Sequence, residues 1–240
     1  MQLRSRQPIP LEASFAVAPG TLAAIVGPSG AGKTTILRAI AGLYRPEHAG
    51  IACAGETWAG PGLWLPPHRR RVGLVFQSYA LFPHLSARAN VAAALGHLPA
   101  RDRVARAEAL LEIVHLAGLG DRRPAQLSGG QQQRVAVARA LARDPAVLLL
   151  DEPFSAVDRR TRRALQAELR ELHAALGIPI LLVTHDLDEA AGLADRLLVL
   201  EGGRLLQEGA PADVLARPAC AAVRRALDLD EAPLFRRRMA

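Results

Sequence analysis

Residues 27–35 read "GPSGAGKTT". This stretch fits the pattern G-x-x-x-x-G-K-[ST], in which glycines let the backbone curl so that successive N–H groups point at a triphosphate. The apolar run "TLAAIV", residues 21–26, comes before it, and residues 35–44 follow with apolar side chains at helical spacing. Strand, glycine loop and helix in this order are what a phosphate-binding loop requires, so the stretch predicts nucleotide binding.

The same stretch holds Lys33, the only lysine in a chain that otherwise uses arginine for its basic side chains. An ammonium on a flexible stem can reach the outer phosphates, and the hydroxyl of Thr34 can ligate Mg²⁺ that bridges them. The alternative is a glycine-rich turn with a surface lysine. We expect Lys33 to serve catalysis as well as binding. The candidate nucleotide-binding residues are Gly27, Pro28, Ser29, Gly30, Ala31, Gly32, Lys33, Thr34 and Thr35.

Two carboxylates end the apolar run "AVLLLDE", residues 146–152. In open parallel sheets, ligands bind beyond the carboxyl ends of the strands, where Asp151 and Glu152 are expected to lie. We expect Asp151 to hold Mg²⁺ directly or through water, and Glu152 to orient or deprotonate the attacking water. The alternative is a pair of surface carboxylates with no chemical role.

Polar side chains also close two other apolar runs. Gln77 follows "RVGLVF", residues 71–76, and His185 ends "IPILLVTH", residues 178–185. The amide of Gln77 can contact both the metal and the water, and the imidazole of His185 can bond the γ-phosphate and hold the catalytic water. A lone histidine at a strand end is often structural, but beside the other strand ends we expect both residues to be catalytic.

A second candidate anion site is "LSGGQ", residues 127–131, which opens a predicted helix. Its serine is a suitable N-cap, and its glycines expose backbone N–H groups at the helix N-terminus. One chain needs one cradle for a γ-phosphate, so we expect this segment to serve the nucleotide of another subunit. Its candidate binding residues are Ser128, Gly129, Gly130 and Gln131.

The remaining chain alternates strand-like and helix-like segments. Residues 44–72 contain proline, glycine and short β-prone pieces, which indicate a small antiparallel section. A later helix is expected between an N-cap at Asp158 and a stop at Gly177, and a hairpin is expected to turn at Gly202 and Gly203. The buried stripe of that helix is predicted to be Leu165, Leu169, Leu172 and Leu176.

Residues 84–145 are predicted to form an inserted helical lobe. One helix there is expected to place Val104, Ala107, Leu110, Leu111 and Val114 on one face. Beyond about residue 217 the chain shows no period. The predicted units are a first part of the nucleotide-binding core at 1–83, the lobe with "LSGGQ" at 84–145, a second part of the core at 146–218, and a C-terminal tail at 219–240.

Composition argues against several classes of protein. The longest apolar runs are far shorter than the roughly 20 residues of a membrane-spanning helix, and no apolar stretch follows the charges at the N-terminus. Cys53 and Cys220 form no metal-like or redox pair, which fits a reducing compartment. We therefore expect a soluble, cytoplasmic chain. The net charge of +7 is spread along the sequence, so no nucleic-acid partner is expected.

Together, "GPSGAGKT", Gln77, "LSGGQ", "LLLDE", "SAVD" at 155–158 and His185 resemble the ATP-binding cassette (ABC) ATPases, in that family's order, over about residues 20–215. "LSGGQ" followed by a Walker B strand is specific to this family. The resemblance implies an α/β fold, in which a P-loop NTPase core with a mostly parallel sheet carries a small antiparallel β section and an inserted helical lobe. It also implies ATP and Mg²⁺ as cofactors, and ATP hydrolysis coupled to transmembrane transport.

The resemblance further implies a head-to-tail homodimer. Two ATPs would be sandwiched, each between the phosphate loop of one subunit and the "LSGGQ" helix of the other, and Asp158 would signal across the interface. Closure on ATP would drive two integral membrane permease subunits, so the chain would lie peripherally at the cytoplasmic face of the inner membrane. An extracytoplasmic substrate-binding protein would choose the cargo.

Residues 65–91 look like importers of inorganic oxyanions and polyamines, and most like the ATPase subunits of molybdate importers. In that group the segment after the glutamine receives a permease helix, so Gln77 to Leu85 would be the docking region. A plain apolar turn is the alternative there. Sulfate, polyamine or iron as cargo, and a non-transport role on nucleic acid or the ribosome, are the alternative functions.

Two features depart from the family pattern. Cassettes of this kind usually place an aromatic residue about two dozen residues before the phosphate loop to stack on adenine, and "LRSRQPIP", residues 3–10, supplies none. The guanidinium of Arg4 or Arg6 is the candidate substitute. Molybdate- and sulfate-type subunits commonly carry a C-terminal β domain, whereas only a short tail follows the core in this sequence. Feedback through such a domain is therefore not expected.

Overall fold

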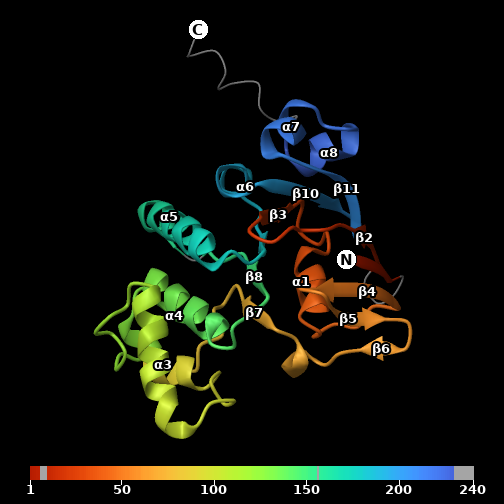
Figure 1. Ribbon diagram of the computed structural model, residues 1–240. Coiled ribbons are helices and arrows are strands. Elements are labelled where there is room, and N and C mark those ends of the chain that lie inside the picture. Colours follow the sequence, from red (N-terminus) through yellow and green to blue (C-terminus); the bar gives the residue numbers. More distant parts are fainter. Residues whose placement is uncertain (6–9, 156, 230–240) are drawn as a thin grey trace.

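The computed structural model describes residues 1–5, 10–155 and 157–229. Figure 1 shows a twisted sheet with helices packed against it and a group of helices set apart from it, between about residues 87 and 141. This arrangement confirms the α/β fold predicted from the sequence, including the lobe of helices inserted between strands.

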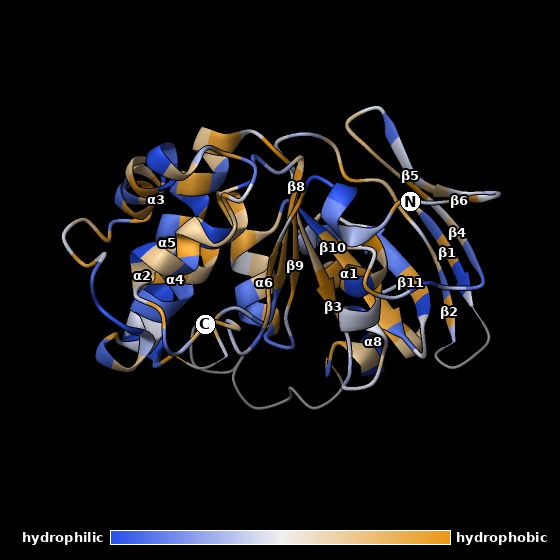
Figure 2. Ribbon diagram, turned by 90° about the horizontal axis from the view of Figure 1, so that it is seen from below, coloured by the Kyte–Doolittle hydropathy of each residue, from blue (hydrophilic) through white to orange (hydrophobic). Residues whose placement is uncertain are grey.

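The half of the sheet nearest the phosphate loop is parallel. Its strands are apolar almost throughout and lie in the middle of the molecule with helices on both sides (Figure 2), as expected for parallel strands whose two faces are covered. The runs predicted at 21–26, 71–76, 146–152 and 178–185 all form strands here. Side by side, the strands are β10 (Arg196–Glu201), β3 (Leu22–Val26), β9 (Ile180–Val183), β8 (Val147–Asp151) and β7 (Val72–Val75).

The other half of the sheet is largely antiparallel. It begins with the predicted hairpin, in which β10 turns into the next strand through Gly202 and Gly203, both with positive φ. The predicted antiparallel section within 44–72 is also present. The two N-terminal strands have no counterpart in the prediction, because four residues with two buried positions each carry too little pattern. In order from β10, this half contains β11 (Arg204–Gly209), β2 (Leu11–Ser14), β1 (Gln2–Ser5), β4 (His48–Cys53), β5 (Glu56–Gly60) and β6 (Leu63–Trp64).

Helices cover the parallel half of the sheet. The longest begins at its N-cap Asp158 and ends at Gly177, where φ is 63°, as predicted. Its stripe is less deeply buried than predicted toward the end, because Leu172 and Leu176 pack only against the edge of the core. The last helix lies where no period was predicted. The helices are α1 (Lys33–Ile40), α5 (Arg159–Leu176), α6 (Leu187–Leu193), α7 (Pro211–Ala216) and α8 (Ala221–Ala226).

The lobe contains α2 (Ala87–Ala92), α3 (Ala100–Ile113) and α4 (Gly129–Leu141). The predicted apolar face of α3 is buried at Ala107, Leu110 and Leu111, but Val104 is 53% exposed, which corrects that part of the prediction. At 100° per residue, Val104 lies at the edge of the buried stripe and near the start of the helix, where solvent reaches it. Val114 is buried just after the helix ends.

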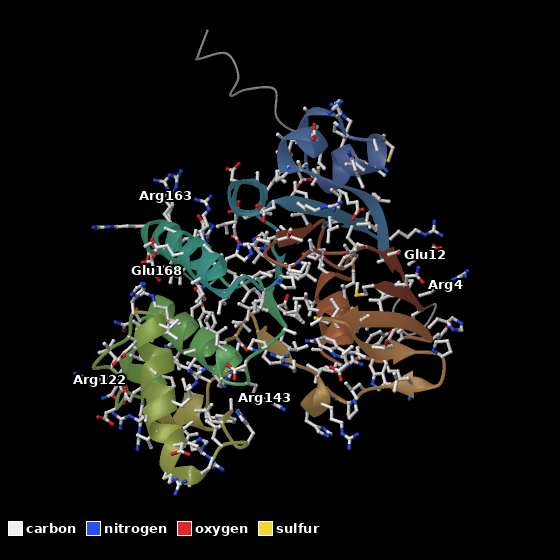
Figure 3. The ribbon with its side chains drawn as sticks, viewed as in Figure 1. Arg4, Glu12, Arg122, Arg143, Arg163 and Glu168 are labelled. Atoms are coloured by element: carbon white, nitrogen blue, oxygen red, sulfur yellow. The ribbon has the colours of Figure 1, made fainter. Side chains whose placement is uncertain are left out.

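The surface carries exposed arginines on several faces, among them Arg4, Arg122, Arg143 and Arg163 (Figure 3). Arg6, the other candidate for stacking on adenine, lies outside the described residues. Over the described ranges, no helix combines the length and the apolar character needed to cross a membrane.

Arg70 fixes the far end of α1. Its buried guanidinium donates to the carbonyl oxygens of Ala39 (2.9 Å) and Ile40 (2.7 Å) and lies 4.3 Å from the ring centre of Trp64. Burial lowers the pKa of Arg70 to about 10, so the side chain stays protonated at neutral pH. This cation satisfies carbonyls at the C-terminus of α1, the favourable end of a helix for positive charge.

Candidate functional site

The phosphate loop connects β3 to α1 and depends on its glycines. Gly27 has a φ of 145°, and a Cβ at this position would lie 1.9 Å from the carbonyl oxygen of Leu200, so no other residue fits without a backbone shift. Gly32 has a φ of 96° at the N-cap of α1. The loop therefore takes the curled form that the motif predicted, with the first turn of α1 directly after it.

The turn between β10 and β11 is hydrogen-bonded to this loop. The Gly203 N–H donates to the Ala31 carbonyl oxygen at 2.9 Å, and a Cβ on Gly203 would lie 2.0 Å from the Pro10 carbonyl oxygen. The sequence indicated a turn at Gly203 but not this contact, because nothing local marks a partner about 170 positions away in the chain.

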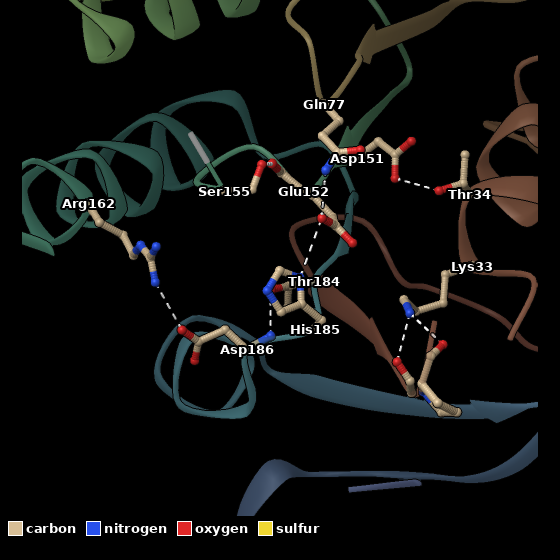
Figure 4. Close-up of polar contacts among 12 residues, drawn as sticks. Lys33, Thr34, Gln77, Asp151, Glu152, Ser155, Arg162, Thr184, His185 and Asp186 are labelled. Carbon is tan, nitrogen blue, oxygen red and sulfur yellow. Dashed lines mark hydrogen bonds and ion pairs between the residues drawn. The ribbon is translucent and has the colours of Figure 1, made fainter. Parts of the chain in front are cut away.

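Lys33 lies over the loop from which it comes. Its Nζ donates to the carbonyl oxygens of Gly27 at 2.7 Å and Pro28 at 2.9 Å (Figure 4). Burial lowers the pKa of Lys33, while the nearby carboxylates of Glu152 and Asp151 act in the opposite direction. The loop thus holds an ammonium among backbone groups, placed to meet an anion.

Thr34 and Asp151 meet at the sheet edge. The Thr34 hydroxyl donates to Asp151 Oδ1 at 2.8 Å. Burial raises the pKa of Asp151, and the hydrogen bond from Thr34 partly offsets that effect. These two side chains line one cavity of about 620 Å³ together with Gln77. Hydroxyl, carboxylate and amide oxygens suit a hard divalent cation such as Mg²⁺.

Such a cation would need further ligands from phosphate or water. Within the described ranges, no cluster of three or more His, Cys, Asp or Glu side chains could hold a metal ion. Mg²⁺ commonly binds through one or two protein groups plus substrate phosphates, so the donor set fits that mode.

Glu152 contacts the other two predicted side chains, Gln77 and His185. Its Oε2 accepts a hydrogen bond from Gln77 Nε2 at 3.0 Å and lies 3.4 Å from His185 Nδ1. Glu152 also has a φ of 46°, an uncommon conformation for a non-glycine residue, and its N–H is bonded to the Val183 carbonyl oxygen at 2.9 Å. The neighbouring strand thus fixes the backbone that aims this carboxylate.

The structure therefore gathers all six predicted side chains of the first site along one sheet edge. The predicted magnesium group is adjacent to the predicted catalytic group, and both flank the phosphate loop. These side chains are Lys33, Thr34, Gln77, Asp151, Glu152 and His185.

The "LSGGQ" segment forms a capped helix start, as predicted. Ser128 Oγ accepts from the Gln131 N–H at 3.3 Å, and Gln131 Oε1 accepts from the Ser128 N–H at 2.9 Å, which is a capping box. Gly130 packs so closely that a Cβ would lie 2.9 Å from Thr161 Cγ2. Among the described residues, no hydrogen bond or ion pair joins this segment to the phosphate loop, and Ser128 is exposed.

Asp158 is the N-cap of α5, near the place where the "LSGGQ" segment packs on that helix. Its carboxylate accepts from the N–H groups of Arg160 and Thr161 and from the Thr161 hydroxyl at 2.6 Å. These hydrogen bonds, that of the Thr161 hydroxyl first, lower the pKa of Asp158. An ionised, exposed aspartate therefore lies one turn from the residue on which Gly130 packs.

Comparison with known proteins finds a matching family model and similar sequences and structures. The family model described as ABC transporter matches residues 11–155. The chain is 50% identical over 210 residues to the Fe(3+) ions import ATP-binding protein FbpC 1 of Rhizobium meliloti (strain 1021), covering 87% of this chain and 58% of that protein. It is 48% identical over 220 residues to the sulfate/thiosulfate import ATP-binding protein CysA 2 of Agrobacterium fabrum, covering 90% and 63%.

The chain spans less than two thirds of the length of these relatives. Among solved structures, it is similar to a dimeric, post-hydrolysis state of the ATP-binding cassette MJ0796 bound to ADP and Pi, with a TM-score of 0.72 and 32% identity over 88% of this chain and 95% of that one. It is also similar to cbiO1 from Clostridium perfringens, part of the complex cbiONQ, with a TM-score of 0.78 and 28% identity over 95% and 92%.

Proposed function

Because this chain belongs to the ABC transporter family, we propose that it is the ATP-hydrolysing subunit of a membrane importer and works as a head-to-tail dimer. The observation that carries the proposal is the convergence of Gln77 and His185 on Glu152, beside a loop that presents Lys33. A carboxylate held by two polar side chains next to a phosphate cradle can bind and activate one water for attack on a γ-phosphate.

Each side chain has a separate task in this proposal. The loop N–H groups and Lys33 bind the phosphates, and Thr34 and Asp151, with Gln77 nearby, are the residues that would hold Mg²⁺. When bound, Mg²⁺ would neutralise charge on the phosphate oxygens. Glu152 takes a proton from the attacking water, which Gln77 and His185 orient.

The second copy completes the site in this proposal. Ser128 is exposed and Gly129 is partly exposed, whereas Gly130 is buried against α5. Ser128 and the N–H groups of the two glycines would bind the γ-phosphate held by the partner. Asp158 would then transmit the closure of the dimer on ATP to the other subunit. The dimeric state named for the similar cassette supports this arrangement.

Transport partners and location follow from the same proposal. Residues Gln77 to Leu85 would receive a helix of a permease subunit, with Phe82 offering a 45% exposed ring. The subunit would lie at the cytoplasmic face of the membrane, and a substrate-binding protein outside would deliver the cargo.

We propose an inorganic ion as cargo, with Fe(III) the first to test and sulfate the second. The support is that the relatives described above are named as Fe(3+) and sulfate/thiosulfate import proteins. The molybdate cargo expected from residues 65–91 has no support among them. Uptake of radiolabelled iron, sulfate and molybdate by cells that lack or carry the chain's gene decides among the three.

Replacing Ser128 with Arg tests the dimeric site. We expect hydrolysis to fall about a hundredfold, the scale for losing preorganised phosphate donors, while ATP binding to the monomer is retained. Steady-state hydrolysis and equilibrium binding of a fluorescent ATP analogue measure the two effects. Ser86→Arg is the matched control, because Ser86 caps α2 in the same lobe by accepting from the Ala89 N–H at 3.2 Å. Equal activities of the two variants would remove the support for a composite site.

A further inference from the structure

Arg139 joins the "LSGGQ" helix to the segment after Gln77. It lies in the last turn of α4, and its Nη1 and Nη2 donate to the carbonyl oxygens of Ala80 at 2.7 Å and Tyr79 at 2.8 Å. Tyr79 and Ala80 both have positive φ, at 58° and 48°. A flat guanidinium matches two adjacent carbonyls that this unusual backbone turns in one direction.

Arg139 keeps its charge at a partly buried position, which costs desolvation free energy. Burial lowers the pKa of Arg139, and none of the ion pairs among the described residues includes it. Its guanidinium also lies 5.8 Å from the ring centre of Phe82. A partly desolvated cation satisfied by backbone carbonyls serves to hold that backbone, since an apolar side chain would fill the space at lower cost.

The same segment is attached to the catalytic carboxylate on its other side. Tyr79 is 5% exposed, and its hydroxyl donates to the Pro153 carbonyl oxygen at 3.3 Å. The amide of Gln77 donates to Glu152, the residue before Pro153. Residues 77–80 are thus held between α4 and the end of β8.

We propose that Arg139 is a positioning residue for Gln77, and that through it the placement of the "LSGGQ" helix sets how Gln77 meets Glu152. The proposal rests on the proposed roles of Gln77 and Glu152 in hydrolysis. When α4 moves toward a partner's nucleotide, the two Arg139 hydrogen bonds carry residues 79 and 80 with it. Gln77, two residues earlier in the same turn, then shifts relative to the carboxylate.

A double-mutant cycle tests this link, using Gln77→Ala, Arg139→Met and the double variant in steady-state ATP hydrolysis. We expect Arg139→Met to lower kcat about tenfold with KM for ATP within about twofold, because the loop N–H groups still bind the phosphates. If Arg139 acts through Gln77, the double variant is no slower than Gln77→Ala alone. Multiplying effects of the two changes would overturn the proposal.

Hydrogen exchange gives a readout that does not depend on activity. Amide exchange in peptides covering residues 76–82 should become at least about tenfold faster in Arg139→Met. Arg143→Met is the matched control, because Arg143 lies one turn further along and donates instead to the His68 carbonyl oxygen at 2.7 Å. It should leave both kcat and this exchange unchanged. Equal exchange in the two variants contradicts the proposal.

The single variants distinguish a failure of the proposed Gln77 role from a failure of the proposed Arg139 role. Full activity of Gln77→Ala would show that the proposed role of Gln77 is wrong, and the Arg139 proposal fails with it. A slow Gln77→Ala beside a fully active Arg139→Met rejects the Arg139 proposal alone. If Arg139→Met does not fold, Arg139→Lys replaces it in the cycle, with a smaller loss of kcat expected because one ammonium can still reach one carbonyl.

Discussion

Glu152→Gln is expected to lower ATP turnover at least about a hundredfold while leaving ATP binding intact. The amide keeps the size of the side chain and can still accept the hydrogen bond from Gln77 Nε2, which is 3.0 Å long in the native chain. It cannot take a proton from water, so only the activation step is lost. Phosphate release measures turnover, and equilibrium binding of ATP measures the retained affinity.

Glu171→Gln provides the control for Glu152→Gln. Glu171 is an exposed carboxylate on α5, and its change should leave turnover within about twofold of the native rate. Full turnover by Glu152→Gln would show that another group activates the water.

Lys33→Arg is expected to lower turnover about a hundredfold although it keeps the positive charge. The Nζ atom occupies a buried position between the carbonyl oxygens of Gly27 and Pro28, at 2.7 and 2.9 Å. A planar guanidinium is larger and cannot sit between these carbonyls and a phosphate in the same way. Steady-state hydrolysis at saturating ATP checks the prediction.

The reverse exchange at an exposed site is the control for Lys33→Arg. Arg163→Lys replaces an exposed arginine of α5 with lysine, so turnover should stay native. Near-native hydrolysis by Lys33→Arg would mean that the loop accepts either cation. The shape of the loop would then not explain why position 33 is a lysine.

The side chains of the site could be predicted because each follows a strong local pattern. Asp151, Glu152 and His185 end continuous apolar runs, and parallel strands bring such ends to one edge. The helix stop at Gly177 and the hairpin glycines were equally local. Each of these features depends on only a few neighbouring residues, so it could be predicted from the sequence.

The parts that escaped prediction depend on distant partners. The hydrogen bonds from Gly203 to Ala31 and from Arg139 to Tyr79 join segments that are far apart in the chain. β1 and β2 are too short for a period to emerge. Val104 was predicted to be buried because it fits the helical stripe, but it is 53% exposed. Its spacing was right, but no neighbouring element among the described residues covers that end of the stripe.

In the proposed dimer, one chain's phosphate loop and another chain's "LSGGQ" segment form one site. The most direct test is the solution mass of Glu152→Gln with Mg²⁺ and ATP, measured by light scattering during gel filtration. The mass should double from the 25.6 kDa of one copy when ATP is added. Adding Ser128→Arg to the same variant should keep the mass at one copy although ATP still binds. A single-copy mass for Glu152→Gln with ATP bound, or a doubled mass despite Ser128→Arg, would show that the two segments do not form one site.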